Sequence, residues 1–221
     1  IIGSRHVDED DREYTEKIAK QAALEGFNVV SGGAKGVDET AMLAALEIDG
    51  TALGIMSNDL FRAALSGKWR KHIRQNNLAL ISPYYPEAGF NTGNAMARNK
   101  YIYILSKAVV VVKSDFNKGG TWAGAKENLK KGWSVPLVRN NEYAGNQELI
   151  KLGGYAIDDA FNDFNREFGT GSDVEQVELN VNTVESDTQV DLFSIDSEST
   201  DESSSKEPNE AEISSAYANN D

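Results

Sequence analysis

A glycine-rich turn stands at the centre of this sequence: Ser31-Gly32-Gly33-Ala34-Lys35-Gly36-Val37-Asp38. A short apolar run, residues 27–30, precedes the turn, and residues 39–46 follow it with helical spacing. A strand, a glycine turn and a helix start in that order can cradle a phosphate, because glycines let backbone N–H groups approach an anion. The turn matches neither the P-loop nor the G-x-G-x-x-G pattern. Tight chain reversal alone is the plainer explanation, so the rest of the chain must decide between the two.

Charge divides the chain into two parts. The 221 residues carry a formal net charge of −13, and residues 170–221 hold fourteen acidic residues against one lysine. The polar composition of that segment predicts a disordered acidic tail, whereas residues 1–169 are neutral and are predicted to form one globular body. Within the body, residues 62–131 hold thirteen basic residues against three acidic ones. That surplus is typical of a surface that binds a polyanion, although a solvated helix face explains any single base equally well.

The composition also excludes several classes of protein. The chain has no cysteine and only two histidines, which argues against disulfide frameworks and zinc sites, and we expect no metal or cofactor. No apolar run is long enough to span a membrane, so we expect a cytoplasmic protein without a membrane partner. The chain opens with Ile1-Ile2-Gly3, which we interpret as the end of a strand truncated at the N-terminus.

Strand and helix patterns alternate along the body, which predicts an α/β fold. The expected strands are residues 1–2, 27–30, 51–55, 77–82, 108–112 and 134–138. The expected helices are residues 12–24, 38–48, 58–65, 68–76, 95–106, 121–131, 147–152 and 157–168. The order implies a Rossmann-like, mostly parallel sheet with helices on both faces. Such sheets bind ligands at the carboxyl ends of their strands, where residues 3–5, 31–38, 82–94 and 114–121 form loops.

These loops carry the residues that suit phosphate binding. Arg5 follows the first strand directly, and its guanidinium can grip a phosphate or form a salt bridge to the acidic residues 8–11. Asn94 is the expected cap of a helix that carries Arg98 and Lys100. Residues 118–121 form a second glycine turn, in which Thr121 is a cap or an anion donor. We predict that Arg5, Lys35 and Arg98 converge on one cationic rim.

The combination of motifs resembles the DNA-processing protein A (DprA/Smf) family of recombination mediators. That family shows Gly-Ser/Thr-Arg after its first strand, as in residues 3–5, and Ser-Gly-x-Ala-Arg-Gly-Ile-Asp, as in residues 31–38. Its Gly-Asn-Phe-Pro-x-Arg-Asn-Arg is matched in part by Gly93-Asn94 and Arg98-Asn99-Lys100, and its Ser-Gly-Ser/Thr by residues 119–121. Ala95-Met96 replaces Phe-Pro, and an acidic tail stands where many members carry a winged helix, so this looks like a divergent branch.

The resemblance implies a protein that binds single-stranded DNA, helps load the recombinase RecA and takes part in natural transformation. It leaves a homodimer open. The aromatic residues Tyr84, Tyr85, Phe90 and Trp122 are candidates for stacking on bases, with core packing as the alternative. The candidate DNA- and phosphate-binding residues are Gly3, Ser4, Arg5, Ser31, Gly32, Gly33, Lys35, Gly36, Asn94, Arg98, Asn99, Lys100, Lys118, Gly119, Gly120 and Thr121.

Two further readings are left open. We see no pair of a nucleophile and a base, so we expect no catalysis. The related nucleotide-binding superfamily nevertheless includes N-glycosidases with Pro-Gly-Gly-x-Gly-Thr-x-x-Glu, and here the position three after Thr121 is Gly124. The tail contains Gln189-Val190-Asp191-Leu192-Phe193, which resembles the pentapeptide that holds the bacterial sliding clamp. Gln189, Asp191, Leu192 and Phe193 therefore make an adaptor role a third hypothesis.

Overall fold

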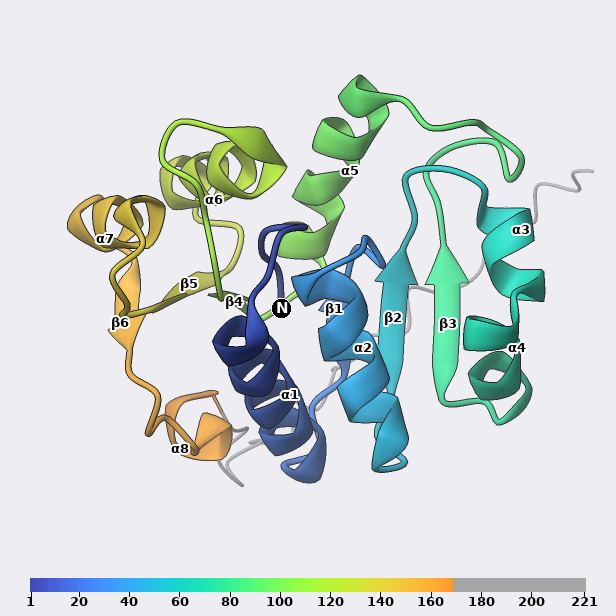
Figure 1. Ribbon diagram of the computed structural model, residues 1–221, viewed down its shortest axis with the longest axis horizontal. Coiled ribbons are helices and arrows are strands. Elements are labelled where there is room, and N and C mark those ends of the chain that lie inside the picture. The colour runs from blue at the N-terminus through green and yellow to red at the C-terminus, as the bar shows by residue number, and fades with distance from the viewer. Residues whose placement is uncertain (169–221) are drawn as a thin grey trace, which may run out of the picture. The chain divides into compact units, whose positions relative to one another are not determined.

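The computed structural model describes residues 1–168 of the chain as strands alternating with helices (Figure 1). The strands are β1 (Val29–Ser31), β2 (Ala52–Ile55), β3 (Leu78–Ile81), β4 (Ala108–Val111), β5 (Val135–Arg139) and β6 (Tyr155–Ile157). The helices are α1 (Glu9–Leu24), α2 (Val37–Glu47), α3 (Leu60–Leu65), α4 (Gly67–Arg74), α5 (Thr92–Ile104), α6 (Gly119–Lys131), α7 (Ala144–Lys151) and α8 (Phe164–Phe168).

All strand pairs are parallel and fall into two groups of three. One group has the order β1-β2-β3 and the other β4-β5-β6. Residues 1–2 lie between the groups: Ile2 forms a parallel bridge with Val111, and the backbone nitrogen of Ile1 donates to the Val30 carbonyl at 2.9 Å. The strand order therefore reverses at this segment, which is the place where such sheets bind ligands.

The two faces of the sheet carry separate apolar cores. Successive residues of β4 point to opposite faces, so Val110 packs with α1 and α2, while Val109 and Val111 pack with α5, α6 and α7. A strand buried on both faces needs the continuous β-branched run that the sequence has here. Helices on both faces of a mostly parallel sheet, as predicted, are confirmed (Figure 1).

Several predicted element boundaries are wrong, each for a local reason. Asn91, not Asn94, caps α5, because its side chain accepts from the Asn94 backbone N–H at 3.0 Å. Thr121 does not cap α6; the N-cap is Lys118, which makes no side-chain cap hydrogen bond. The helix expected over residues 157–168 is the end of β6 followed by the short α8.

The acidic segment expected over residues 170–221, including the pentapeptide at residues 189–193, lies outside the described residues. Among the described residues, no helix has the length and apolar character needed to cross a membrane.

Candidate functional site

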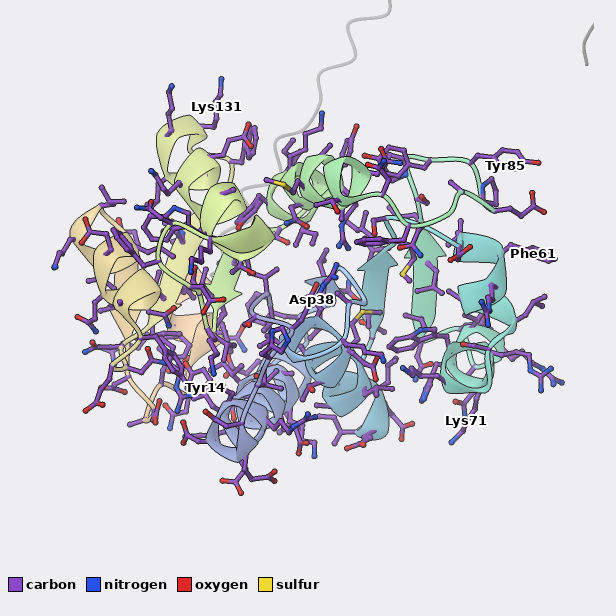
Figure 2. All side chains as sticks on the ribbon, turned by 45° about the horizontal axis from the view of Figure 1, so that its top comes forward. Tyr14, Asp38, Phe61, Lys71, Tyr85 and Lys131 are labelled. Carbon is purple, nitrogen blue, oxygen red and sulfur yellow. The ribbon has the colours of Figure 1, made fainter. Side chains whose placement is uncertain are left out.

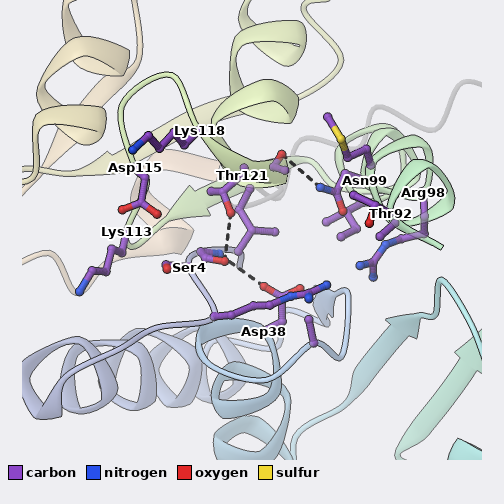
Figure 3. Close-up of a pocket in the computed structure, with 18 of the residues that line it drawn as sticks. Ser4, Asp38, Thr92, Arg98, Asn99, Lys113, Asp115, Lys118 and Thr121 are labelled. Atoms are coloured by element: carbon purple, nitrogen blue, oxygen red, sulfur yellow. Dashed lines mark hydrogen bonds between the residues drawn. The ribbon is translucent and has the colours of Figure 1, made fainter. Parts of the chain in front are cut away.

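A cavity of about 410 Å³ lies at the carboxyl edge of the sheet, beside the reversal point (Figure 3). All four loops that the sequence placed at this edge contribute to its lining. The lining includes Gly3, Ser4, Arg5, His6, Ala34, Asp38, Phe90, Thr92, Met96, Arg98, Asn99, Tyr103, Lys113, Asp115, Lys118, Gly119, Gly120 and Thr121.

Arg5 and Phe90 form one exposed wall of the cavity. The Arg5 guanidinium lies 5.3 Å from the centroid of the Phe90 ring, and 55% of Phe90 is exposed. Arg5 itself is exposed, and no carboxylate pairs with it among residues 1–168. The salt bridge to residues 8–11 that the sequence left open is therefore not formed. A free guanidinium over an exposed ring offers a cation and a stacking surface side by side.

The first turn of α6 forms another part of the cavity lining. Gly119 has φ +76°, which a residue with a side chain rarely adopts, and it leads the chain into the helix. The Thr121 hydroxyl donates to the Gly3 carbonyl at 3.0 Å, and the Asn99 amide donates to the Gly120 carbonyl at 3.2 Å (Figure 3). These bonds hold the turn in place. The turn has no side-chain cap, and Lys118 projects from it, so this wall presents positive charge to the cavity.

Asp38 forms the floor of the cavity and holds two loops together. Its carboxylate accepts from the backbone N–H groups of Gly3, at 3.4 Å, and Gly32, at 3.2 Å. Burial raises the pKa of Asp38, and attraction to Arg98 and these hydrogen bonds act in the opposite direction. The N–H groups of Gly3 and Gly32 are thus bound to the carboxylate of Asp38, and they are not free to bind a phosphate.

Arg98 is buried near Asp38 and is not part of an exposed cationic rim. Only 3% of the residue is exposed, and its guanidinium donates to the Ile55 carbonyl. A side chain on Gly32 would collide with both Arg98 and Asp38, which explains the glycine. Burial lowers the pKa of Arg98, attraction to Asp38 raises it, and repulsion from Arg5 lowers it. The two arginines are therefore neighbours with different surroundings.

The other predicted residues are distributed more widely. Arg5 and Arg98 both line the cavity, whereas Lys35 is exposed and is not a lining residue, although its neighbour Ala34 is one. Lys100 packs over the Tyr101 ring at 5.0 Å and also lies outside the lining. The remaining predicted residues outside the lining are Ser31, Gly32, Gly33, Gly36 and Asn94. Ser31 is buried and its hydroxyl donates to the Ile1 carbonyl at 2.6 Å.

Lys113, two residues after the end of β4, lines the cavity but was not among the predicted site residues. Its ammonium lies 2.6 Å from an Asp11 carboxylate oxygen and 3.0 Å from the Tyr143 hydroxyl. Burial lowers the pKa of Lys113, but these hydrogen bonds outweigh burial and raise it above the ordinary value. Its position just after the carboxyl end of a buried strand could have identified it from the sequence as a residue of the site. Its charge is neutralised, so Lys113 positions the loop and is not free for a ligand.

One carboxylate cluster has the spacing of a metal site among the described residues. Asp8, Asp10 and Asp11 lie within reach of one another, but Lys113 and Arg139 pair with them. A helix cap and two cations thus account for the cluster.

The family model described as DNA recombination-mediator protein A matches residues 1–167. Protein Smf of Synechocystis is 29% identical over 140 residues, covering 62% of this chain and 35% of that protein. The DNA processing protein DprA of Bacillus subtilis is 26% identical over 163 residues, covering 71% and 54%. This chain therefore spans about a third to a half of the length of these relatives.

A solved structure agrees with the fold. DNA processing protein A of Helicobacter pylori superposes with a TM-score of 0.59 at 26% identity, covering 71% of this chain and 73% of that one. The published description of that structure concerns its mode of binding single-stranded DNA.

Proposed function

Since this chain belongs to the DNA recombination-mediator protein A family, we propose that it binds single-stranded DNA in the cavity at the carboxyl edge of its sheet. Support comes from the Helicobacter pylori relative, whose structure was described for its binding of single-stranded DNA. The observation that carries the proposal is local. Arg5 and Lys118 both line the cavity, and neither makes an ion pair within residues 1–168.

Each group has a distinct role in the proposed complex. Arg5 and Lys118 contact backbone phosphates, helped by the first-turn N–H groups of α6. Phe90, held beneath Arg5, stacks on a base. Asp38 and Arg98 are positioning residues, because they fix the loops that present those groups and are themselves buried.

A salt titration with single-site variants tests this proposal. Binding of an oligothymidylate is followed by fluorescence anisotropy across salt concentrations. Arg5→Ala and Lys118→Ala are each expected to flatten the slope of log K against log salt by about 0.7, the value for one phosphate contact on a single strand. Lys131→Ala, an exposed lysine at the far end of α6, is the matched control. Affinity that does not change with salt, or equal effects from all three variants, contradicts the proposal.

We propose a binding protein and not an enzyme. The N-glycosidase pattern needs a glutamate where this chain has Gly124, and a Cβ atom there would lie 2.9 Å from the Tyr103 ring. A glutamate at this position would therefore press against the Tyr103 ring. Glu127, one turn further along α6, is exposed. Release of free base from nucleoside monophosphates by the purified chain would favour the enzyme.

The finer assignments belong to the same proposal. A mediator of this kind works with a RecA-type recombinase, in a cytoplasmic pathway such as natural transformation, and as a monomer or a homodimer. The pentapeptide at residues 189–193 is proposed to bind the sliding clamp. Deleting it should abolish recovery of the clamp in a pull-down while leaving DNA affinity unchanged, and unchanged recovery would remove this part.

A further inference from the structure

A second basic surface lies on α4, apart from the cavity. Arg70, Lys71 and Arg74 line a hollow of about 420 Å³ together with Gly67 and Gln75. All five residues are exposed. The sequence from residue 60 to residue 86 holds five basic residues and no acidic one. This α4 surface is therefore a local concentration of positive charge in a body that is neutral as a whole.

The charges on the α4 surface are unpaired. Lys68 is bound to Glu39 at 2.6 Å, which leaves Arg70, Lys71 and Arg74 without a carboxylate partner among residues 1–168. Bases in the last turn of a helix do complement its dipole, worth about 0.3–1 kcal/mol each when exposed. That effect alone leaves unexplained the absence of acidic residues from the sequence between residues 60 and 86 and the hollow between the side chains.

The topology separates the α4 surface from the cavity. Helix α4 ends at Arg74 and leads into the amino end of β3, whereas the cavity is at the carboxyl ends of the strands. Figure 1 shows α4 beside the base of β3, and in Figure 2 Lys71 projects outward, away from Asp38. One short segment of DNA in the cavity therefore does not run onto α4 by simple extension.

We propose that the α4 surface is a second binding site for the phosphate backbone of nucleic acid, so that one chain holds two separate segments of single strand. The proposal rests on the proposed function of the cavity. The lining favours a nucleic-acid backbone over an acidic peptide, because it contains no apolar side chain to anchor a peptide. Arg70 and Arg74 stand one helical turn apart, about 5–6 Å between Cβ atoms, and so can contact neighbouring phosphates.

The experiment compares short and long oligothymidylates on the full chain. The triple variant Arg70→Gln, Lys71→Gln, Arg74→Gln removes the charges, and Lys126→Gln, Lys130→Gln, Lys131→Gln on α6 removes the same charge from exposed positions elsewhere. An oligonucleotide of about 10 nucleotides fits one site, whereas one of about 60 spans both. The α4 variant should bind the short one at the cavity with unchanged affinity, but with one equivalent per chain where wild type binds two. With the long one its salt slope should fall by about 2, since three phosphate contacts on a single strand contribute about 0.7 each.

A second readout tests the holding of two segments. Two short oligonucleotides, labelled with a donor and an acceptor dye, should show energy transfer with the wild type and the α6 variant, and lose it with the α4 variant. An α4 variant with the same affinity and salt slope as wild type for the long oligonucleotide overturns the inference. It does so even if Arg5→Ala weakens binding and thereby shows that DNA binds in the cavity. Equal losses in the α4 and α6 variants also overturn it. So does an α4 variant that loses affinity for polyglutamate, the probe for an acidic peptide, while it keeps its affinity for DNA. Failure of the short oligonucleotide to bind wild type contradicts the proposed function instead.

Discussion

Replacing the two neighbouring arginines separately should produce opposite phenotypes, because one is buried and the other exposed. Arg98→Ala removes an attraction that opposes the burial penalty of the Asp38 carboxylate, and it leaves the Ile55 carbonyl without this donor. Leaving a buried polar group without its partner costs about 1–3 kcal/mol. For a domain of this size that is a fall in Tm of roughly 2–12 °C. Arg5→Ala removes an exposed side chain and should change the free energy of unfolding by less than about 0.5 kcal/mol.

Thermal unfolding by circular dichroism and DNA binding by anisotropy separate these outcomes. Arg98→Ala should lower Tm and weaken DNA binding less than Arg5→Ala does, whereas Arg5→Ala should keep Tm and lose affinity. Adding Asp38→Asn to Arg98→Ala should restore part of the stability, because the amide carries no buried charge, although its single oxygen can accept from only one of Gly3 and Gly32. A Tm unchanged by Arg98→Ala, together with a loss of DNA binding equal to that of Arg5→Ala, would refute the reasoning.

The pH dependence of the same variant gives an independent check with a definite sign. Burial raises the pKa of Asp38 above its unfolded value, and without Arg98 the main attraction that opposes burial is gone. A carboxyl with a raised folded pKa binds more protons in the folded state, so stability falls as pH rises from the unfolded to the folded pKa. The stability deficit of Arg98→Ala relative to wild type should therefore shrink towards acidic pH, as measured by urea midpoints. A deficit that grows as pH falls would show that Asp38 is not its cause.

Three further predictions follow from other contacts. Gly32→Ala should lower stability by about 1–3 kcal/mol in urea unfolding, because the added methyl group overlaps Arg98, and an unchanged midpoint would contradict the packing. Phe90→Ala should weaken oligothymidylate binding by about 1–3 kcal/mol while leaving the salt slope unchanged, and a changed slope would mean that its role is electrostatic. Hydrogen bonds from Arg139 lower the pKa of Asp159, so their stabilisation is present above the unfolded pKa of about 3.9 and is lost as pH falls through the folded pKa. The stability difference between wild type and Asp159→Asn should therefore vanish in strong acid, and a difference that persists there would argue against the ion pair.

The order of elements was predictable from the chain because its signals are local. The β-branched run at residues 108–112 could only be a strand buried on both faces, and β4 is one. The rule that ligands bind at carboxyl ends then selected four loops, and all four line the cavity. Both the buried strand and the four loops could be predicted without knowledge of how the side chains pack.

The roles of individual side chains were less predictable, because they depend on contacts between distant residues. Asp38 bonds to Gly3, which is 35 residues away, and nothing near either residue signals that pairing. Arg98 and Lys35 look equally suited to phosphate binding in the sequence, yet one is buried against Ile55 and the other is exposed outside the cavity. Asn91 and Asn94 are equally good caps by residue type, and only the backbone geometry selects the first.

The segment that joins the two groups of strands has a mechanical consequence. Each group is held together by runs of paired residues, whereas residues 1–2 join the groups through few backbone bonds. Ile1 donates to the Val30 carbonyl on one side, and on the other side the Ile2 N–H donates to Val110 and the Ile2 carbonyl accepts from Val112. Elements held by few backbone bonds open first in native-state fluctuations. The cavity lies across this joint, with Asp38 on one side and Thr121 on the other. A polymer bound to both sides would therefore cross-link the two groups of strands. Binding of a ligand in the cavity and the rigidity of the joint between the two groups of strands are therefore coupled.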